Sequence, residues 1–321
     1  MESLSLVYGS FPILFIMFYI ILTFNKWIYR QDVTTKLFNQ CSKVCFYICI
    51  FQWTLLILLG LYSRVILGLD RGELLNLEHN FLISGTSFVY IFAFVYIVRK
   101  IRLKGVICII VAFLAIDLIF MGKKFVFYLL ALSLFRVDSH SYIKSIKPVI
   151  LALSGGVTFV LAIFIIRALA TNSPLVLGLY SIFSEFIGVV STVGFALEYG
   201  QNIDSIWKVV SDLQPFYYDS VGHGLALNPV SYFIITGGDN WFVALIIYAF
   251  IFILIFYVFS MLLGDLVLLI LLMNIIHFFR HGPDIFLFQF VTQAFAVTFI
   301  MYLGLLKKKN LIATNLKKGS Y

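Results

Sequence analysis

Charged residues are scarce in this chain of 321 residues, since Asp, Glu, Lys and Arg make up only 12% of it. A soluble domain of this size would need about twice that share to cover its surface. The hydrophobic residues, 62% of the chain, gather instead in long runs. Runs of about twenty apolar residues have the length that crosses a hydrocarbon core of about 30 Å. A soluble fold is therefore excluded, and we expect most of the chain to lie in lipid.

Nucleotide and metal signatures are missing as well. The sequence contains no P-loop, no dinucleotide-binding glycine fingerprint, no HExxH and no Cys/His ligand spacing. We therefore expect no cofactor, and a substrate that carries its own energy or is moved by a gradient. Cysteine is rare, and Cys41, Cys45 and Cys49 recur every four residues along one predicted helix. This spacing is typical of small residues that pack one helix against another.

The apolar runs also lack the strict alternation that a membrane barrel requires. A chain in lipid must satisfy its own backbone hydrogen bonds, which only helices and closed barrels can do. Since the barrel is excluded, the spans are expected to be helices. We therefore predict an all-α polytopic membrane protein with about nine transmembrane helices, forming a single integral membrane domain over residues 1–321. The predicted spans lie near 5–24, 44–67, 81–98, 106–121, 125–135, 148–167, 241–263, 265–279 and 284–306.

Positive charge is clustered beside the apolar runs. The formal net charge is +8, and its main clusters lie within 26–43, within 99–104 and in the tail from Lys307 to Lys318. Such short clusters mark the cytoplasmic ends of helices. The excess of positive charge thus indicates how the chain is oriented in the membrane and does not indicate nucleic-acid binding. It places the N-terminus outside and the C-terminus inside the cell.

The segment 197–240 has the opposite character, with five acidic residues against one lysine. A lysine-poor loop belongs outside, so we expect a large periplasmic loop here. The segment 174–196 before it is then a re-entrant or interfacial segment. The alternative merges 106–135 into one broken crossing and lets 174–196 span, but it would bury Lys123 and Lys124 in the bilayer.

Four basic side chains lie at predicted outer helix ends, against the usual charge bias. They are Lys123, Lys124, Arg167 and Arg280. One interpretation is that they recognise an anionic group, most plausibly a diphosphate. The other is that they extend toward lipid headgroups, as Lys and Arg commonly do at helix ends.

The predicted outer loop carries further candidates. His223, between two glycines, could act as a general base, with Asp219 orienting it or acting alone. It could equally be a solvated loop histidine. The aromatic residues Tyr217, Tyr218 and Trp241 could stack on sugar rings or anchor the loop in the membrane interface.

Ionisable residues also occur within the predicted spans. Asp117 and Arg64 are either functional positions or a structural pair. His277, beside Asn274, is either a hydrogen-bonding residue between helices or an intramembrane catalytic histidine, as in membrane-bound acyltransferases.

Three stretches resemble the O-antigen polymerase (Wzy-type) family. They are the break Met121–Lys124 between short helices, the run Gly224–Trp241 that leads from the outer loop into a helix, and the element Phe279–Asp284 before the last helix. Together with the single large outer loop, they extend the resemblance over about the last two thirds of the chain. The resemblance there concerns the order of helices and loops.

This resemblance implies a metal-independent glycosyltransferase of the bacterial inner membrane. It would join undecaprenyl-diphosphate-linked oligosaccharide units on the periplasmic side, in the synthesis of lipopolysaccharide O-antigen or another surface polysaccharide. The four basic residues at outer helix ends would bind the diphosphate, His223 or Asp219 would assist the acceptor hydroxyl, and the loop aromatics would hold the glycan. A chain-length regulator, a flippase and membrane lipids would be partners.

Two other classes remain as alternatives. A secondary transporter, or a flippase of polysaccharide intermediates, would place ionisable residues at the membrane midplane in repeated broken helices. No such repeat is apparent in the sequence. A membrane-bound acyltransferase would depend on His277 and not on the outer loop.

Overall fold

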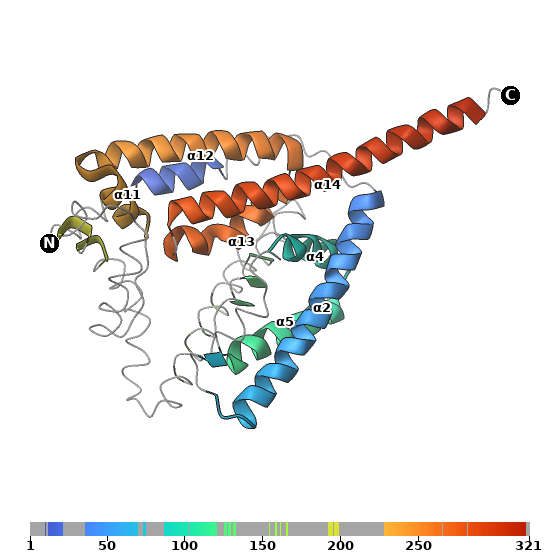
Figure 1. The fold of residues 1–321 in the computed structure, drawn as a ribbon, viewed down its shortest axis with the longest axis horizontal. Helices are drawn as coiled ribbons and strands as arrows, with labels where there is room; N and C mark the ends of the chain where they lie inside the picture. The colour runs from blue at the N-terminus through green and yellow to red at the C-terminus, as the bar shows by residue number, and fades with distance from the viewer. Residues whose placement is uncertain are drawn as a thin grey trace. The chain divides into compact units, whose positions relative to one another are not determined.

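A computed structural model shows a helical protein, with no strand in the part of the chain that it describes (Figure 1). The residues it describes are 10, 12–21, 36–69, 73–74, 87–101, 103–120, 125–126, 128–129, 131–132, 154, 158, 161, 165, 192–194, 196–198, 228–264, 266–280 and 282–318.

The chain divides into two compact units, each built from separate stretches of sequence. Unit 1 comprises Met1–Tyr29, Ala168–Leu262 and Asn274–Val291, and unit 2 comprises Arg30–Arg167, Leu263–Met273 and Thr292–Tyr321.

Unit 2 is organised around α2 (Lys36–Val65), which contacts both α4 (Ser87–Lys100) and α5 (Leu103–Ile119). Trp53 of α2 packs edge-on against Phe113 of α5, with ring centroids 4.6 Å apart. Gly60 allows α2 and α5 to approach closely, because a Cβ atom there would lie 2.6 Å from the Ile119 side chain. A larger residue at this position would force α2 and α5 apart.

The side chains of Arg64 and Asp117 both bind backbone groups in unit 2. The Arg64 guanidinium donates to the carbonyl oxygens of Leu118 and Ile119, at 2.9 and 3.1 Å. The buried Asp117 carboxylate accepts from the backbone N–H groups of Phe125 and Val126, at 3.2 and 2.7 Å. The carbonyl groups at the end of a helix have no partner within it, so Arg64 caps the end of α5, and Asp117 provides an acceptor for two backbone N–H groups. These bonds give each of the two side chains a structural role, while a pairing of the two with each other and a functional role stay predictions.

Unit 1 contains α11 (Pro229–Gly237), the short 3₁₀ helix η4 (Gly238–Asn240) and α12 (Trp241–Leu263). Asn228 begins α11 as its N-cap, since its side-chain oxygen accepts from the N–H groups of Val230 and Ser231, both at 3.0 Å. Gly238 has φ +51°, a conformation that favours glycine, and here the chain turns from α11 into α12 (Figure 1). Residues 229–240, at the end of the predicted outer loop, are thus helical.

Two further helices, α13 (Leu266–Arg280) and α14 (Pro283–Lys318), each begin in one unit and end in the other. Within unit 1, the first turns of α14 pack on α12 through phenylalanine rings. The Phe252 ring lies 5.1 Å from Phe286 and 5.3 Å from Phe290, centroid to centroid. All three side chains are fully buried. Aromatic rings in such tilted arrangements gain attraction beyond simple burial, so this cluster holds the start of α14 in place.

Three stretches are long and apolar enough to cross a membrane: Lys36–Val65, Pro229–Leu263 and Pro283–Leu306. The second is interrupted at Gly238, so α12 alone provides its straight part. The 23 residues of α12 span about 34 Å at 1.5 Å per residue, which is sufficient for a bilayer core. The protein is therefore a helical membrane protein.

The shorter apolar helices Pro12–Ile21 and Leu266–Ile275 add to these three. The full set of nine crossings, the periplasmic side of the outer loop and the re-entrant path of 174–196 stay predictions, because most of the residues concerned lie outside the described part.

Candidate functional site

Polar groups of unit 1 gather where α13 ends and α14 begins, and we call Arg280–Asp284, with Tyr232 and Tyr248, the α13–α14 junction. The last residue of α13 is Arg280, and Pro283 opens α14 with Asp284 in its first turn. Proline suits a first helical position, and a carboxylate in the first turn is stabilised by the helix dipole. The sequence Gly-Pro-Asp therefore specifies a sharp restart of the helix.

Gly282 sets the geometry of this restart. Its φ is +102°, which L side chains rarely adopt. A Cβ atom on it would lie 2.9 Å from Oδ1 of Asp284 and 3.2 Å from Cδ2 of Tyr232. The Asp284 carboxylate and the Tyr232 ring therefore both border the backbone of Gly282. Glycine is needed here both for the backbone conformation and for the space.

Tyr232 comes from α11, far along the chain from the junction that it borders. Its side chain is half-buried, and its ring lies against Gly282 together with the Asp284 carboxylate. The Asn228 cap holds α11 at its start, and the buried Ser231 hydroxyl adds a hydrogen bond of 3.0 Å to the Asn228 carbonyl. A carboxylate and a phenol are thus brought close together on an anchored helix.

Tyr248 of α12 ties a third element to the same place. Its hydroxyl donates to the Pro283 carbonyl oxygen at 2.9 Å. Its ring stacks with Phe252 at 6.4 Å and with Phe278 at 6.2 Å, centroid to centroid. The bond ties α12 to the first residue of α14, and the stacking fixes the phenol that makes it. Tyr248 is therefore a positioning residue of the junction.

The junction offers a defined chemistry. The carboxylate of Asp284, half-buried beside a phenol, can accept a proton from a hydroxyl group. The Tyr232 hydroxyl is a hydrogen-bond donor and acceptor of the kind that orients a sugar. Arg280 is the last residue of α13 and lies two residues before Gly282. Its side chain is not among those that the structure describes.

Trp241 is the one predicted glycan-binding residue within the described part. It is half-buried and packs beside an apolar cluster of Val193, Ala196, Val230 and Ile234. Its ring also contacts Phe242 at 5.5 Å. Trp241 therefore helps to hold the turn between α11 and α12, and sugar binding by this residue stays a prediction.

The remaining predicted site residues are not placed. His223, Asp219, Tyr217, Tyr218, Lys123, Lys124 and Arg167 lie outside the described residues. His277 is half-buried on α13, close in sequence to the buried Asn274. Its two interpretations stay open.

Sequence reasoning included Tyr232 only among the aromatic residues of the outer loop and Asp284 only within the element Phe279–Asp284, and it did not include Tyr248. A signal existed for Asp284, because Gly282-Pro283-Asp284 is a helix-start pattern. No spacing rule joins the two tyrosines to it, since the turn at Gly238 lies between them. Among the residues that the structure describes, no three His, Cys, Asp or Glu side chains lie together as metal ligands would.

No protein-family model matches this chain, and no curated protein and no solved structure matches it. The likeness to O-antigen polymerases therefore rests on the sequence motifs alone.

Proposed function

We propose that this protein polymerises lipid-linked oligosaccharide repeat units in a bacterial inner membrane. It would transfer the growing chain from one undecaprenyl diphosphate to the next unit, in O-antigen or other surface polysaccharide synthesis. The observation that carries the proposal is the α13–α14 junction, where a helix ending in Arg280 meets a carboxylate and a phenol at Asp284 and Tyr232.

The reaction breaks the bond between the anomeric carbon and the diphosphate oxygen and forms a bond to an acceptor hydroxyl. Negative charge develops on the leaving diphosphate, which a guanidinium can bind in a bidentate manner. Arg280 is the candidate for that role, with Lys123, Lys124 and Arg167 as further predicted contacts.

The acceptor hydroxyl must lose its proton as the new bond forms. Asp284 is a candidate base, in addition to the predicted His223 and Asp219, and it lies on the face predicted to be periplasmic. The Tyr232 hydroxyl can orient the acceptor sugar by hydrogen bonding. Tyr248 keeps the junction in place through its bond to Pro283. Since the donor carries its own diphosphate leaving group, the chemistry needs no nucleotide.

Deletion of the gene in a host with a long surface glycan tests this function. A polymerase predicts that the glycan shortens to one repeat unit on the lipid core, because single units are still exported and attached. A flippase predicts no unit on the core. Undiminished long-chain glycan, or complete loss of the first unit, would overturn the proposal. Complementation with the wild-type chain is the control.

A further inference from the structure

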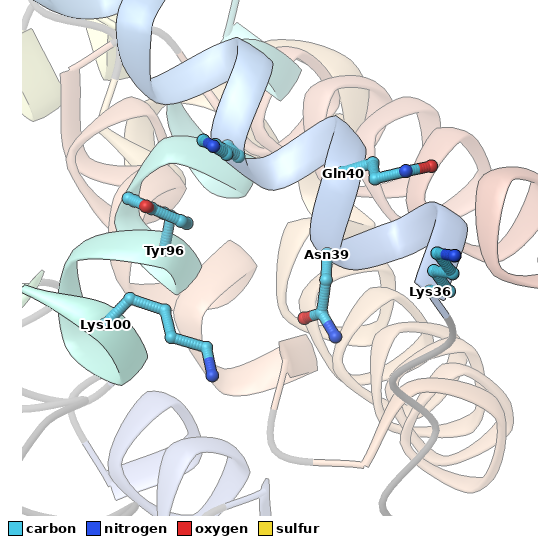
Figure 2. A pocket seen from close by; sticks show the side chains of 6 residues that line it. Lys36, Asn39, Gln40, Tyr96 and Lys100 are labelled. Atoms are coloured by element: carbon cyan, nitrogen blue, oxygen red, sulfur yellow. The ribbon is translucent and has the colours of Figure 1, made fainter.

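A second cluster of polar side chains lies in unit 2, where the start of α2 faces the end of α4. It lines an open hollow of about 540 Å³. The residues that line this basic hollow are Lys36, Asn39, Gln40 and Lys43 of α2, with Tyr96 and Lys100 of α4. Figure 2 shows Lys100 extending toward the side of α2 from which Asn39 projects. The hollow is thus formed jointly by two helices in contact.

The charge of the basic hollow has one sign. Of the six described side chains that line it, three are lysines and none is an acid. The first turn of α2 also contains no acidic residue, so the positive end of the helix dipole is not offset there. Within the described part of the chain, no carboxylate forms an ion pair with any of these lysines. Three ammonium groups held near one another repel, and an anion between them relieves that repulsion.

The exposed surface of α2 indicates at which level of the bilayer the basic hollow lies. Lys36, Asn39 and Lys43 are exposed polar residues in its first turns. From Val44, 57% exposed, to Val65, 75% exposed, the exposed large side chains are apolar. The helix has 30 residues, so it is about 45 Å long, whereas a hydrocarbon core is about 30 Å thick. The polar first turns therefore lie at the level of lipid headgroups.

We infer that the basic hollow binds the phosphate headgroup of an anionic phospholipid. Its volume exceeds what a single inorganic phosphate fills and lies within the range of small-ligand pockets. Lysines supply the charge, while the amides of Asn39 and Gln40 and the Tyr96 hydroxyl can hydrogen-bond to phosphate and glycerol oxygens. Acyl chains would follow the exposed apolar face of α2 that begins at Val44. This inference does not depend on the proposed function.

The test uses the purified full-length protein in a neutral detergent and follows its thermal unfolding. Phosphatidylglycerol, phosphatidylcholine and inorganic phosphate are titrated separately. Binding to the native state raises the unfolding temperature, so the concentration dependence gives an apparent affinity. We expect stabilisation by phosphatidylglycerol at concentrations where the other two have no effect. Equal stabilisation by phosphatidylcholine, or by inorganic phosphate alone, would overturn the headgroup assignment.

A matched pair of variants locates the site. Lys43→Gln removes a charge that lines the hollow, whereas Lys104→Gln removes an exposed charge on α5 that does not line it. We expect Lys43→Gln to weaken the response to phosphatidylglycerol about fivefold, the effect of one lysine near an anionic headgroup. Lys104→Gln should weaken it less. Equal losses in the two variants would show diffuse attraction and would contradict a built site.

The triple variant Lys36→Gln, Lys43→Gln, Lys100→Gln should lose the response by about a hundredfold. Its unfolding temperature without added lipid shows whether the chain is still folded. If the triple variant does not fold, Lys43→Arg serves instead, because it retains the charge and should retain the response. A folded triple variant with the wild-type response would refute the inference.

Discussion

The α13–α14 junction and the basic hollow are both polar places in an apolar protein, but they are built differently. At the junction, Tyr232 and Asp284 border a backbone that permits only glycine, and Tyr248 is tied to it by a 2.9 Å hydrogen bond. In the hollow, exposed lysines on two helices surround an open space. A fixed arrangement of dissimilar groups suits chemistry on one bond. A loose arrangement of like charges suits retention of an anion.

The largest effect that this comparison predicts concerns the junction carboxylate. Asp284→Asn removes the candidate base while keeping the size of the side chain and its ability to accept hydrogen bonds at a helix start. We expect the rate of repeat-unit polymerisation by purified protein to fall about 10²- to 10⁴-fold. Synthetic lipid-linked units and electrophoresis of the products provide the measurement.

Asp239→Asn is the matched control, because Asp239 is an exposed carboxylate in the same unit. Its rate should equal that of the wild type. An Asp284→Asn enzyme with the wild-type rate would leave the carboxylate with only a structural role at the start of α14.

A smaller effect is expected from the glycine at the break. Gly282→Ala introduces both an unfavourable φ and a contact of 2.9 Å with the Asp284 carboxylate. We expect it to lower the free energy of unfolding by about 1–3 kcal/mol, since the strain cannot be relieved without moving Asp284 or Tyr232. Chemical denaturation in detergent measures the change.

Gly68→Ala provides the comparison, because Gly68 also has a positive φ, +63°, but no described neighbour would lie within 4 Å of a Cβ atom added there. The loss should therefore be smaller than at Gly282. Equal losses at the two glycines would mean that crowding at the junction contributes nothing.

The smallest effect is expected at Tyr248. Tyr248→Phe removes one hydroxyl and leaves the Pro283 carbonyl without that donor, while the ring can keep its stacking on Phe252 and Phe278. We expect a loss of about 1 kcal/mol in the free energy of unfolding. Tyr302→Phe is the control, since Tyr302 is exposed on α14. A loss no larger than in that control would show that the bond to Pro283 does not stabilise the junction.

The helices in the described part of the chain were largely predictable from sequence, because apolar runs in lipid have one regular solution. The predicted span 241–263 coincides with α12, and 265–279 differs from α13 by one residue at each end. The predicted span over α2 begins at 44, whereas the helix begins at Lys36. Hydropathy marks where the hydrocarbon ends, but the hydrogen bonds of a helix continue into the headgroup region. The eight residues missed there, 36–43, include the four residues of α2 that line the basic hollow.

The candidate site was less predictable. Arg280 stands out in the sequence because a basic residue at an outer helix end is unusual, whereas Asp284 is only one member of the same motif. Tyr232 has the pattern of a loop aromatic, since two adjacent glycines follow α11 and suggest an irregular segment. Its approach to Gly282 depends on the turn at Gly238 and on tertiary packing, which a local pattern does not contain. The hydrogen bonds of Arg64 and Asp117 to backbone groups also depend on tertiary packing, so the sequence did not predict them.

The measurement that tests the central claim most directly is the chain length of the surface glycan in a deletion host complemented with Arg280 variants. Arg280→Ala should yield a single repeat unit on the lipid core, because the leaving diphosphate loses its cation. Arg280→Lys should restore only short chains, since an ammonium keeps the charge but not the bidentate geometry. Full-length glycan from a stably expressed Arg280→Ala protein would contradict the assignment of the α13–α14 junction as the polymerising site.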